Sequence, residues 1–289
     1  MAGAAQPVSG FRADGPGPAI SADEVAREVS KLARNIETTG LDALAGGAPY
    51  LRIDDLHAGY GHMEILHGLN LRVGRGQSLC LIGPNGAGKS TVLHSIFGFT
   101  NIFSGSVSTA RATGSVDVTR LSANEKLRSA GIAYILQDKS IFPNMTVEEN
   151  LWMGGFLMDR SAAAKAAAEK VFDSYPRLAA RRRHPAKVLS GGERRLLEIS
   201  RALVMDPDIL LVDEPSIGLE PRFIDAVFEI LGDLQHKAGK TIVMVEQNAK
   251  KGLEFADIGY VLASGQVAMA GRAKDLLANP DVGRLFLGG

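Results

Sequence analysis

The fold of this 289-residue chain is decided by the stretch Gly83-Pro84-Asn85-Gly86-Ala87-Gly88-Lys89-Ser90. It follows the apolar run Ser78–Ile82 and precedes a helix-forming stretch that begins at Thr91. A strand, a glycine-rich loop and a helix in this order are typical of a phosphate-binding loop, because glycines let backbone N–H groups approach phosphate oxygens at the positive end of a helix. The pattern therefore predicts an α/β fold that binds a nucleotide.

The positions of this loop have distinct expected roles. Lys89 should reach the β- and γ-phosphates, and Ser90 should place its hydroxyl on Mg²⁺. The alternative interpretation is a glycine-rich turn with an exposed lysine. The expected nucleotide-binding residues of the loop are Gly83, Asn85, Gly86, Gly88, Lys89, Ser90 and Thr91.

A second apolar run, Ile209–Val212, ends in the two carboxylates Asp213 and Glu214. A buried parallel strand delivers its C-terminal residues into the ligand crevice, so Asp213 should hold the same Mg²⁺ through its water shell. Glu214 is the expected general base, since a carboxylate beside the metal site can orient the attacking water and accept its proton. An acidic surface residue at a strand end is the alternative for Glu214.

A third apolar run, residues 131–136, ends at Gln137. Its amide would contact Mg²⁺ or the attacking water and sense the γ-phosphate. A glutamine after a strand is commonly just solvated, so this prediction depends on the order of the motifs.

The stretch Leu189-Ser190-Gly191-Gly192-Glu193 predicts an anion-binding helix start, because a serine cap and two glycines leave the N-terminal N–H groups open. The alternative is an ordinary capped helix after a loop. This anion site would have a role only if it contacted a nucleotide that a second copy of the chain binds. The motif therefore predicts a dimer. The helix should present one apolar face and carry its polar residues elsewhere. The face residues are Leu196, Ile199, Ser200 and Leu203, and the polar ones are Arg194, Arg195 and Glu198.

These motifs and their order along the chain resemble those of the nucleotide-binding subunits of ATP-binding-cassette (ABC) transporters. The resemblance covers the chain from about Tyr50 to the C-terminus. The resemblance implies a P-loop NTPase cassette with a RecA-like core, an antiparallel β-subdomain and an α-helical subdomain inserted at about 142–190. It also implies ATP and Mg²⁺ as ligands and Tyr60 as the aromatic that stacks on adenine. Taken alone, a tyrosine between two glycines is equally a turn residue.

Three positions depart from the family pattern. The stretch Leu189–Glu193 corresponds to the signature motif of the family, and it ends in Glu193 where many members have Gln. Glu220 replaces an aspartate in the loop after Glu214. Gln247 stands where the family usually has its switch histidine. Its amide still donates a hydrogen bond to γ-phosphate, but it does not gain or lose a proton near neutral pH. A regulatory cassette that binds ATP and barely hydrolyses it is therefore an alternative.

The segment Val245-Glu246-Gln247-Asn248 resembles the ATP-binding subunits of branched-chain amino-acid importers, as do residues 145–151, 214–219 and 286–289. This resemblance implies a second ABC ATPase subunit, in a homo- or heterodimer, and transmembrane permease subunits as partners. It implies a solute-binding protein as an indirect partner, and a peripheral location on the cytoplasmic face of the bacterial inner membrane. A soluble ABC protein acting on nucleic acid or ribosomes is the remaining alternative; such proteins usually carry two cassettes or basic arms.

Composition sets further bounds. Lys plus Arg equals Asp plus Glu, 32 against 32, so no broad nucleic-acid surface is expected. The dense basic run Arg181–His184 is expected on a solvated face, or against a partner or anionic lipid. The single Cys80 excludes a disulfide within one chain. No run approaches the ~20 apolar residues that span a bilayer, and no secretory segment is expected at the N-terminus.

The chain divides into an N-terminal extension, residues 1–48, and an ATPase domain, residues 49–289. Within the extension we expect a mobile stretch over 1–19 and an amphipathic helix over 22–38, which docks on a partner, docks on the cassette or is dispensable. Within the insert, a methionine and aromatic stripe is expected to be mostly core and partly a docking groove for a membrane subunit. The stripe comprises Phe142, Pro143, Met145, Trp152, Met153, Phe156 and Met158.

Overall fold

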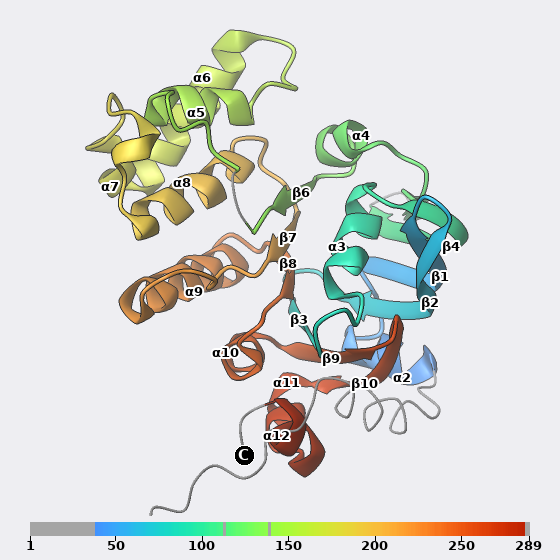
Figure 1. Cartoon of the computed structure of the whole chain (residues 1–289). Helices are drawn as coiled ribbons and strands as arrows, with labels where there is room; N and C mark the ends of the chain where they lie inside the picture. Colours follow the sequence, from blue (N-terminus) through green and yellow to red (C-terminus); the bar gives the residue numbers. More distant parts are fainter. Residues whose placement is uncertain (1–37, 112–113, 138–139, 287–289) are drawn as a thin grey trace, which may run out of the picture.

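The computed structural model describes residues 38–111, 114–137 and 140–286 (Figure 1). The expected mobile stretch over 1–19 lies outside these residues, and so does the expected helix over 22–38 apart from its last residue. Among the described residues, no helix combines the length and hydropathy needed to cross a bilayer.

The centre of the molecule is a six-stranded sheet in the order β10-β9-β3-β8-β7-β6. The four strands β3, β8, β7 and β6 run parallel, β9 runs parallel to β3, and β10 pairs antiparallel with β9 as a hairpin. The central strands β3, β7 and β8 are buried along their whole length and apolar apart from one end residue each, as in sheets covered on both faces. The strand bounds are β3 Ser78–Ile82, β6 Ile132–Ile135, β7 Ile209–Asp213, β8 Thr241–Val245, β9 Ile258–Ala263 and β10 Gln266–Arg272.

Helices and a second sheet cover the two faces of the central sheet. One face packs against α3 (Lys89–Phe97) and a four-stranded antiparallel sheet in the order β2-β1-β4-β5. The other face packs against three helices that supply a second apolar cluster. These are α8 Gly191–Leu203, α9 Pro221–His236 and α10 Ala249–Phe255, while the small sheet comprises β1 Leu51–Tyr60, β2 Met63–Val73, β4 Asn101–Arg111 and β5 Gly114–Asp117.

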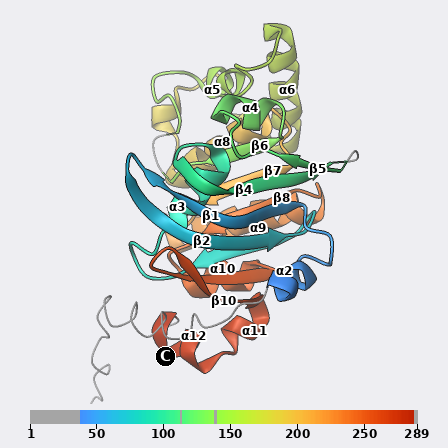
Figure 2. The same cartoon turned by 90° about the vertical axis from the view of Figure 1, so that its right-hand side faces the viewer.

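A helical region between β6 and β7 has its own apolar core. Figure 2 shows it at one end of the molecule, beyond the strands of the central sheet. Its first helix begins at a reciprocal cap, in which Thr146 accepts from the backbone N–H of Glu149 and the Glu149 carboxylate accepts from that of Thr146. The region comprises α5 Val147–Gly154, α6 Ser161–Ser174, α7 Pro176–Ala179, η1 Ala186–Val188 and the start of α8.

Short helices complete the molecule. α4 (Ala123–Arg128) precedes β6, and α11 (Ala273–Leu277) follows β10 directly. A further helix, α12 (Pro280–Phe286), comes after it.

The described part of the N-terminal extension packs against the cassette. Helix α2 (Thr38–Leu44) buries Leu41 and presents Asp42, whose carboxylate accepts a 2.8 Å hydrogen bond from the Nε of Arg72. Arg72 is fully buried in β2 and also pairs with Asp54 of β1. A buried guanidinium is tolerated because it is paired and hydrogen-bonded, so α2 supplies one of its two carboxylates.

Candidate nucleotide-binding and hydrolysis site

The carboxyl ends of β3, β7 and β8 lie side by side, because β8 pairs parallel with both of the others. Val245 is opposite Leu81 of β3 and opposite Asp213 of β7. The phosphate loop after β3, the carboxylate pair at the end of β7 and Gln247 after β8 therefore emerge at one edge of the sheet, where open α/β sheets bind ligands.

The phosphate loop is tightly constrained at Gly83. Its φ is 150°, and a Cβ there would lie 2.3 Å from the carbonyl oxygen of Leu262. The loop closes around its own lysine, because the Nζ of Lys89 donates to the carbonyls of Gly83 and Pro84 at 2.9 and 3.0 Å. Burial lowers the pKa of Lys89, and the nearby carboxylates of Glu214 and Asp213 oppose that shift. The ammonium group is thus already held at the loop where phosphate would bind.

A pocket of about 390 Å³ opens over this loop. It brings the expected platform Tyr60 together with the loop and Glu214. The ring of Tyr60 is partly exposed, and its hydroxyl is hydrogen-bonded to Nδ1 of His94. An aromatic face at one side and backbone N–H groups at the other suit a base and a phosphate chain. The lining residues are Tyr60, Ile65, Asn85, Gly86, Gly88, Lys89, Ser90, Thr91 and Glu214.

The carboxylate of Asp213 is held at both oxygens. Oδ1 accepts from the hydroxyl of Ser90 at 3.2 Å, and Oδ2 accepts from the hydroxyl of Tyr134 at 2.8 Å. A serine hydroxyl beside a carboxylate is the oxygen donor set that Mg²⁺ uses together with phosphate oxygens and water. The part of the chain that the structure describes has no cluster of three or more His, Cys, Asp or Glu that would hold a metal alone. The hydroxyl of Ser90 and the carboxylate of Asp213 fit a metal that also takes oxygen ligands from the phosphates of a nucleotide.

Tyr134 was not among the residues expected from the sequence. The sequence does contain a sign of its role, because Tyr134 is a phenol within the otherwise apolar strand β6. A phenol hydroxyl needs a hydrogen-bond partner when it is buried. Burial and the adjacent Asp213 raise the pKa of Tyr134, so it stays a proton donor.

Glu214 has an unusual backbone. Its φ is 42°, in the left-handed region that disfavours a side chain, and its N–H donates to the carbonyl of Val245 at 2.9 Å. The carboxylate accepts a 3.0 Å hydrogen bond from the Nε2 of Gln137. Burial, followed by the charge of Asp213, raises the pKa of Glu214. Strain and a raised pKa at one carboxylate are features that concentrate at functional sites.

The signature motif lies apart from the phosphate loop of the same chain. Ser190 caps α8, since its hydroxyl accepts from the N–H of Glu193 and its N–H donates to the Glu193 carboxylate. Ser190, Gly192 and Glu193 line a different pocket, of about 340 Å³, whereas Gly191 is exposed. The structure thus brings together the phosphate loop, Tyr60, Asp213, Glu214 and Gln137, and leaves the signature outside that group.

Arg195 and Glu198, which were expected away from the apolar face of α8, are not at the surface. Both are buried and form an ion pair of 2.9 Å. Arg195 also donates to the carbonyl of Leu136 at 2.8 Å, next to Gln137, and its other terminal nitrogen lies 3.4 Å from the carbonyl of Asp213. The helix is covered on more than its apolar face because the ends of β6 and β7 supply acceptors for the guanidinium.

Two of the three departures from the family pattern lie at the surface. The side chain of Gln247 is exposed after β8, and Glu220 forms an exposed ion pair with Arg222 at 3.0 Å. Between Val245 and Gln247, however, Glu246 is buried and accepts hydrogen bonds from Ser216. Glu246 was not among the site residues expected from the sequence.

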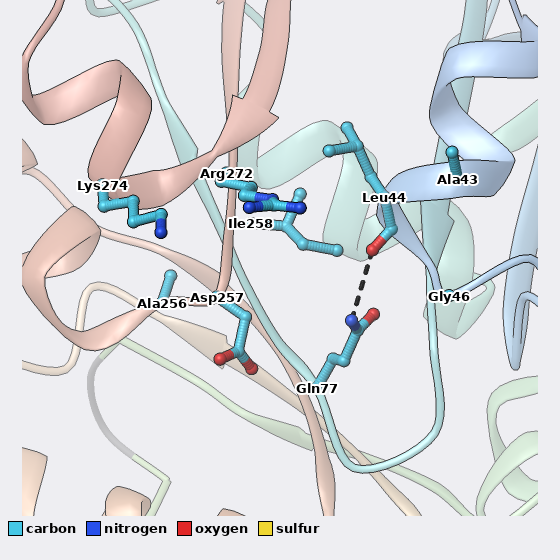
Figure 3. Close-up of a pocket in the computed structure, with 9 residues that line it drawn as sticks. All are labelled: Ala43, Leu44, Gly46, Gln77, Ala256, Asp257, Ile258, Arg272 and Lys274. Atoms are coloured by element: carbon cyan, nitrogen blue, oxygen red, sulfur yellow. Dashed lines mark hydrogen bonds between the residues drawn. The ribbon is translucent and has the colours of Figure 1, made fainter.

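The pocket of about 580 Å³ in Figure 3 lies away from every expected site residue. One wall is the end of α2, where Leu44 offers its carbonyl to Gln77. The opposite wall carries Arg272 and Lys274, whose side chains are exposed. This pocket therefore marks the seam between extension and cassette.

Comparison with known proteins gives consistent matches. The family profile of ABC transporters matches residues 66–217. The high-affinity branched-chain amino acid transport ATP-binding protein BraG of Pseudomonas aeruginosa is 40% identical over 83% of this chain and 100% of its own length. The probable branched-chain amino acid transport ATP-binding protein LivF of Archaeoglobus fulgidus is 36% identical over 82% of this chain and 98% of its own. A crystal structure of the ADP conformation of an ATP-binding cassette of an ABC transporter aligns with a TM-score of 0.72 and 30% identity, over 84% of this chain and 100% of that one. Further relatives are named for export and release systems.

Proposed function

Because this chain belongs to the ABC transporter family of ATP-binding ATPases, we propose that it drives an importer as one of two cassettes that close on two molecules of Mg-ATP. The second cassette is a further copy or a related ATPase subunit. The proposal rests on the separation of two half-sites in one chain.

The two half-sites are the pocket over the phosphate loop and the helix start at Ser190. Each offers N–H groups to an anion, and neither surrounds a triphosphate alone. Opposing two chains head to tail places the signature of one over the phosphate loop of the other. ATP would then hold the two chains together, and its loss would release them.

Within this arrangement the expected residues divide the work of binding the nucleotide and its metal. The ammonium group of Lys89 contacts the β- and γ-phosphates, and Tyr60 stacks on adenine. Ser90, Asp213 and Gln137 would hold Mg²⁺, which neutralises charge that develops on the phosphates. At the signature of the partner chain, Ser190, Gly191, Gly192 and Glu193 would meet the γ-phosphate.

Glu214 acts as general base in the hydrolytic step. It accepts a proton from water while the water oxygen bonds to the γ-phosphorus and the bond from that phosphorus to the bridging oxygen breaks. A raised pKa makes its carboxylate a stronger base, and Gln137 holds that carboxylate in place. The amide of Gln247 donates to γ-phosphate in place of the usual histidine.

A groove beside β6 is the proposed seat of a permease helix, on the cytoplasmic face of the inner membrane. Its volume is about 290 Å³, and its lining includes Tyr134, Ile135 and three exposed apolar side chains, Phe142, Met153 and Phe156. Adaptable methionine and aromatic surfaces suit helix-in-groove contacts. Trp152 and Met158 of the expected stripe instead pack against the core of the helical region.

The transported solute is proposed to be a branched-chain amino acid or a related small polar organic molecule, delivered by a solute-binding protein. This rests on the names of the relatives BraG and LivF. In the proposed arrangement the solute contacts the permease and the solute-binding protein, and no residue of this chain.

The test compares the purified chain with Glu214→Gln, measuring ATP turnover and size-exclusion profiles in Mg-ATP. We expect slow turnover by the wild type, and for the variant lost turnover with an ATP-dependent dimer. Glu229→Gln, an exposed change on α9, is the matched control and should behave as wild type. If the wild type binds ATP but shows no turnover even with its neighbouring ATPase and permease subunits, the regulatory alternative suggested by Gln247 replaces this proposal.

A further inference from the structure

A buried carboxylate directly precedes Gln247. Glu246 is 1% exposed, and its Oε1 accepts a 2.7 Å hydrogen bond from the hydroxyl of Ser216 and a 2.9 Å one from the N–H of Asn248. The N–H of Ser216 lies 3.3 Å from the other oxygen. A buried charge is costly unless such donors satisfy it, and the hydrolytic steps proposed above leave Glu246 without a task.

These bonds join two segments that are far apart in the sequence. Ser216 lies two residues after Glu214, in the loop that runs on through the exposed Ile217 toward α9. Asn248 follows Gln247 and caps α10, because its side chain accepts from the N–H of Lys251. The same loop is also tied to β8 where Glu214 donates to Val245. Glu246 thus connects the segment of the expected base with the segment of Gln247.

The surrounding packing leaves room for this one side chain. Gly252 of α10 faces it, and a Cβ on Gly252 would lie 3.0 Å from the Cβ of Glu246 and 2.6 Å from the sulfur of Cys80. The lack of a side chain on α10 at that point therefore admits the carboxylate. The bond of 2.7 Å to the Ser216 hydroxyl has the short length of a charge-assisted hydrogen bond.

We propose that Glu246 is a positioning residue for ATP hydrolysis, which fixes the loop after Glu214 relative to Gln247. When two cassettes close, the loop after Glu214 faces the opposite chain. The hydrogen bonds of Glu246 then fix the position of the Gln247 amide, which meets γ-phosphate, relative to that loop. Glu246 acts through Ser216 and Asn248 and does not contact the nucleotide. This inference rests on the closing dimer of the proposed function.

The test uses the full chain with Glu246→Gln, Ser216→Ala and the double variant, assayed with the neighbouring subunits. In Glu246→Gln the side chain keeps its shape, but one carboxylate oxygen is replaced by an NH₂ group. This hydrogen-bond donor would face the donors of Ser216 or Asn248. We expect turnover to fall about 10- to 100-fold, since this is the factor that loss of a hydrogen bond to a charged group represents. Ser216→Ala should lower turnover in the same direction, and the double variant should be no worse than Glu246→Gln alone.

The readout that separates positioning from folding is ADP binding by the single chain. The Kd for ADP should match wild type in both single variants, because Glu246 does not contact nucleotide, whereas the urea midpoint should fall in both, because a buried hydrogen-bond partner is lost. The matched control is Glu254→Gln on the exposed side of α10. Unchanged turnover in either single variant would overturn the inference, as would a parallel loss of ADP binding and stability in Ser216→Ala. If the wild type forms no ATP-dependent dimer, the proposed function fails and this inference fails with it.

Discussion

The hydroxyl of Tyr134 donates a 2.8 Å hydrogen bond to Asp213, and thereby fixes the carboxylate oxygen that Ser90 does not hold. The ring of Tyr134 is itself enclosed, with the rings of His94, Phe97 and Phe99 at centroid distances of 5.6 to 6.0 Å. His94 in turn holds the hydroxyl of Tyr60. One aromatic cluster therefore supports both the expected adenine platform and the expected metal-binding carboxylate.

Tyr134→Phe should weaken the Mg²⁺ dependence of nucleotide binding. Outer partners of metal ligands typically change metal affinity about 10-fold or more when removed. We expect the Mg²⁺ concentration for half-maximal ATP binding to rise by about that factor, with metal-free ATP binding unchanged. Tyr175→Phe in the helical region is the control, and an equal shift there would contradict the assignment.

Lys126 should make stability rise with pH. Its ammonium group is fully buried and lies 3.3 Å from the carbonyl of Ser95, near the end of α3. Burial lowers the pKa of Lys126 to about 8, and the charge of Asp117 partly opposes the shift. Below pH 8 the lysine is protonated in both states, whereas between pH 8 and ~10.4 the unfolded chain binds more protons. Stability from this group therefore increases across that window as pH rises.

Lys126→Met should remove this increase. Between pH 7 and 9.5 the lysine contributes a gain of at most about 2 kcal/mol, which urea unfolding at the two pH values measures. Lys250→Met, an exposed change on α10, should leave the gain in place. A variant with the wild-type pH dependence would show that Lys126 is not its source.

Two alanine substitutions in the phosphate loop should differ in cost. At Gly86 φ is 79° and nothing lies within 4 Å of an added Cβ, so Gly86→Ala pays only backbone strain, about 1–2 kcal/mol. At Gly83 the same change also drives the Cβ into the backbone carbonyl of Leu262. Urea unfolding should find Gly83→Ala the less stable of the two. Equal stabilities would mean that β9 moves aside readily.

Gln247→His should introduce a titrating group at a position where the wild type has none. Glutamine does not titrate, whereas an unperturbed histidine changes charge near pH ~6.5. We expect Gln247→Ala to lower turnover and Gln247→His to restore part of it, with a rate that varies between pH 6 and 7.5. Gln266→Ala on β10 is the exposed control. Full activity in Gln247→Ala would remove this residue from the mechanism.

The apolar strands and the motifs at their ends could be predicted from the sequence, because each depends on neighbours within a few residues. The strand before Gly83, the strand ending at Asp213 and the cap at Thr146 are local patterns of this kind. The structure confirms the α/β fold inferred from them, and also the antiparallel sheet and the helical region that the family resemblance implied.

The polar contacts across elements could not be predicted in the same way. Glu246 and Tyr134 take their partners 30 and 79 residues away. Likewise, the run Arg181–His184 is not a uniformly solvated face. Arg182 pairs with Glu148 and Glu169 at 2.8 and 2.7 Å, each from a different helix. A charged residue is satisfied by donors and acceptors that only the folded chain brings near, so its sequence neighbours do not reveal them.

The bond between Asp42 and Arg72 changes what can be deleted from this chain. BraG matches 239 residues of this sequence, which suggests cutting the gene back to the expected ATPase domain, residues 49–289. Such a cut would remove Asp42 and leave the buried guanidinium of Arg72 with the single carboxylate of Asp54. In evolutionary terms, we expect relatives that lack residues 38–45 also to lack the arginine at position 72. A shortened version is therefore best produced with Arg72 replaced by an uncharged residue.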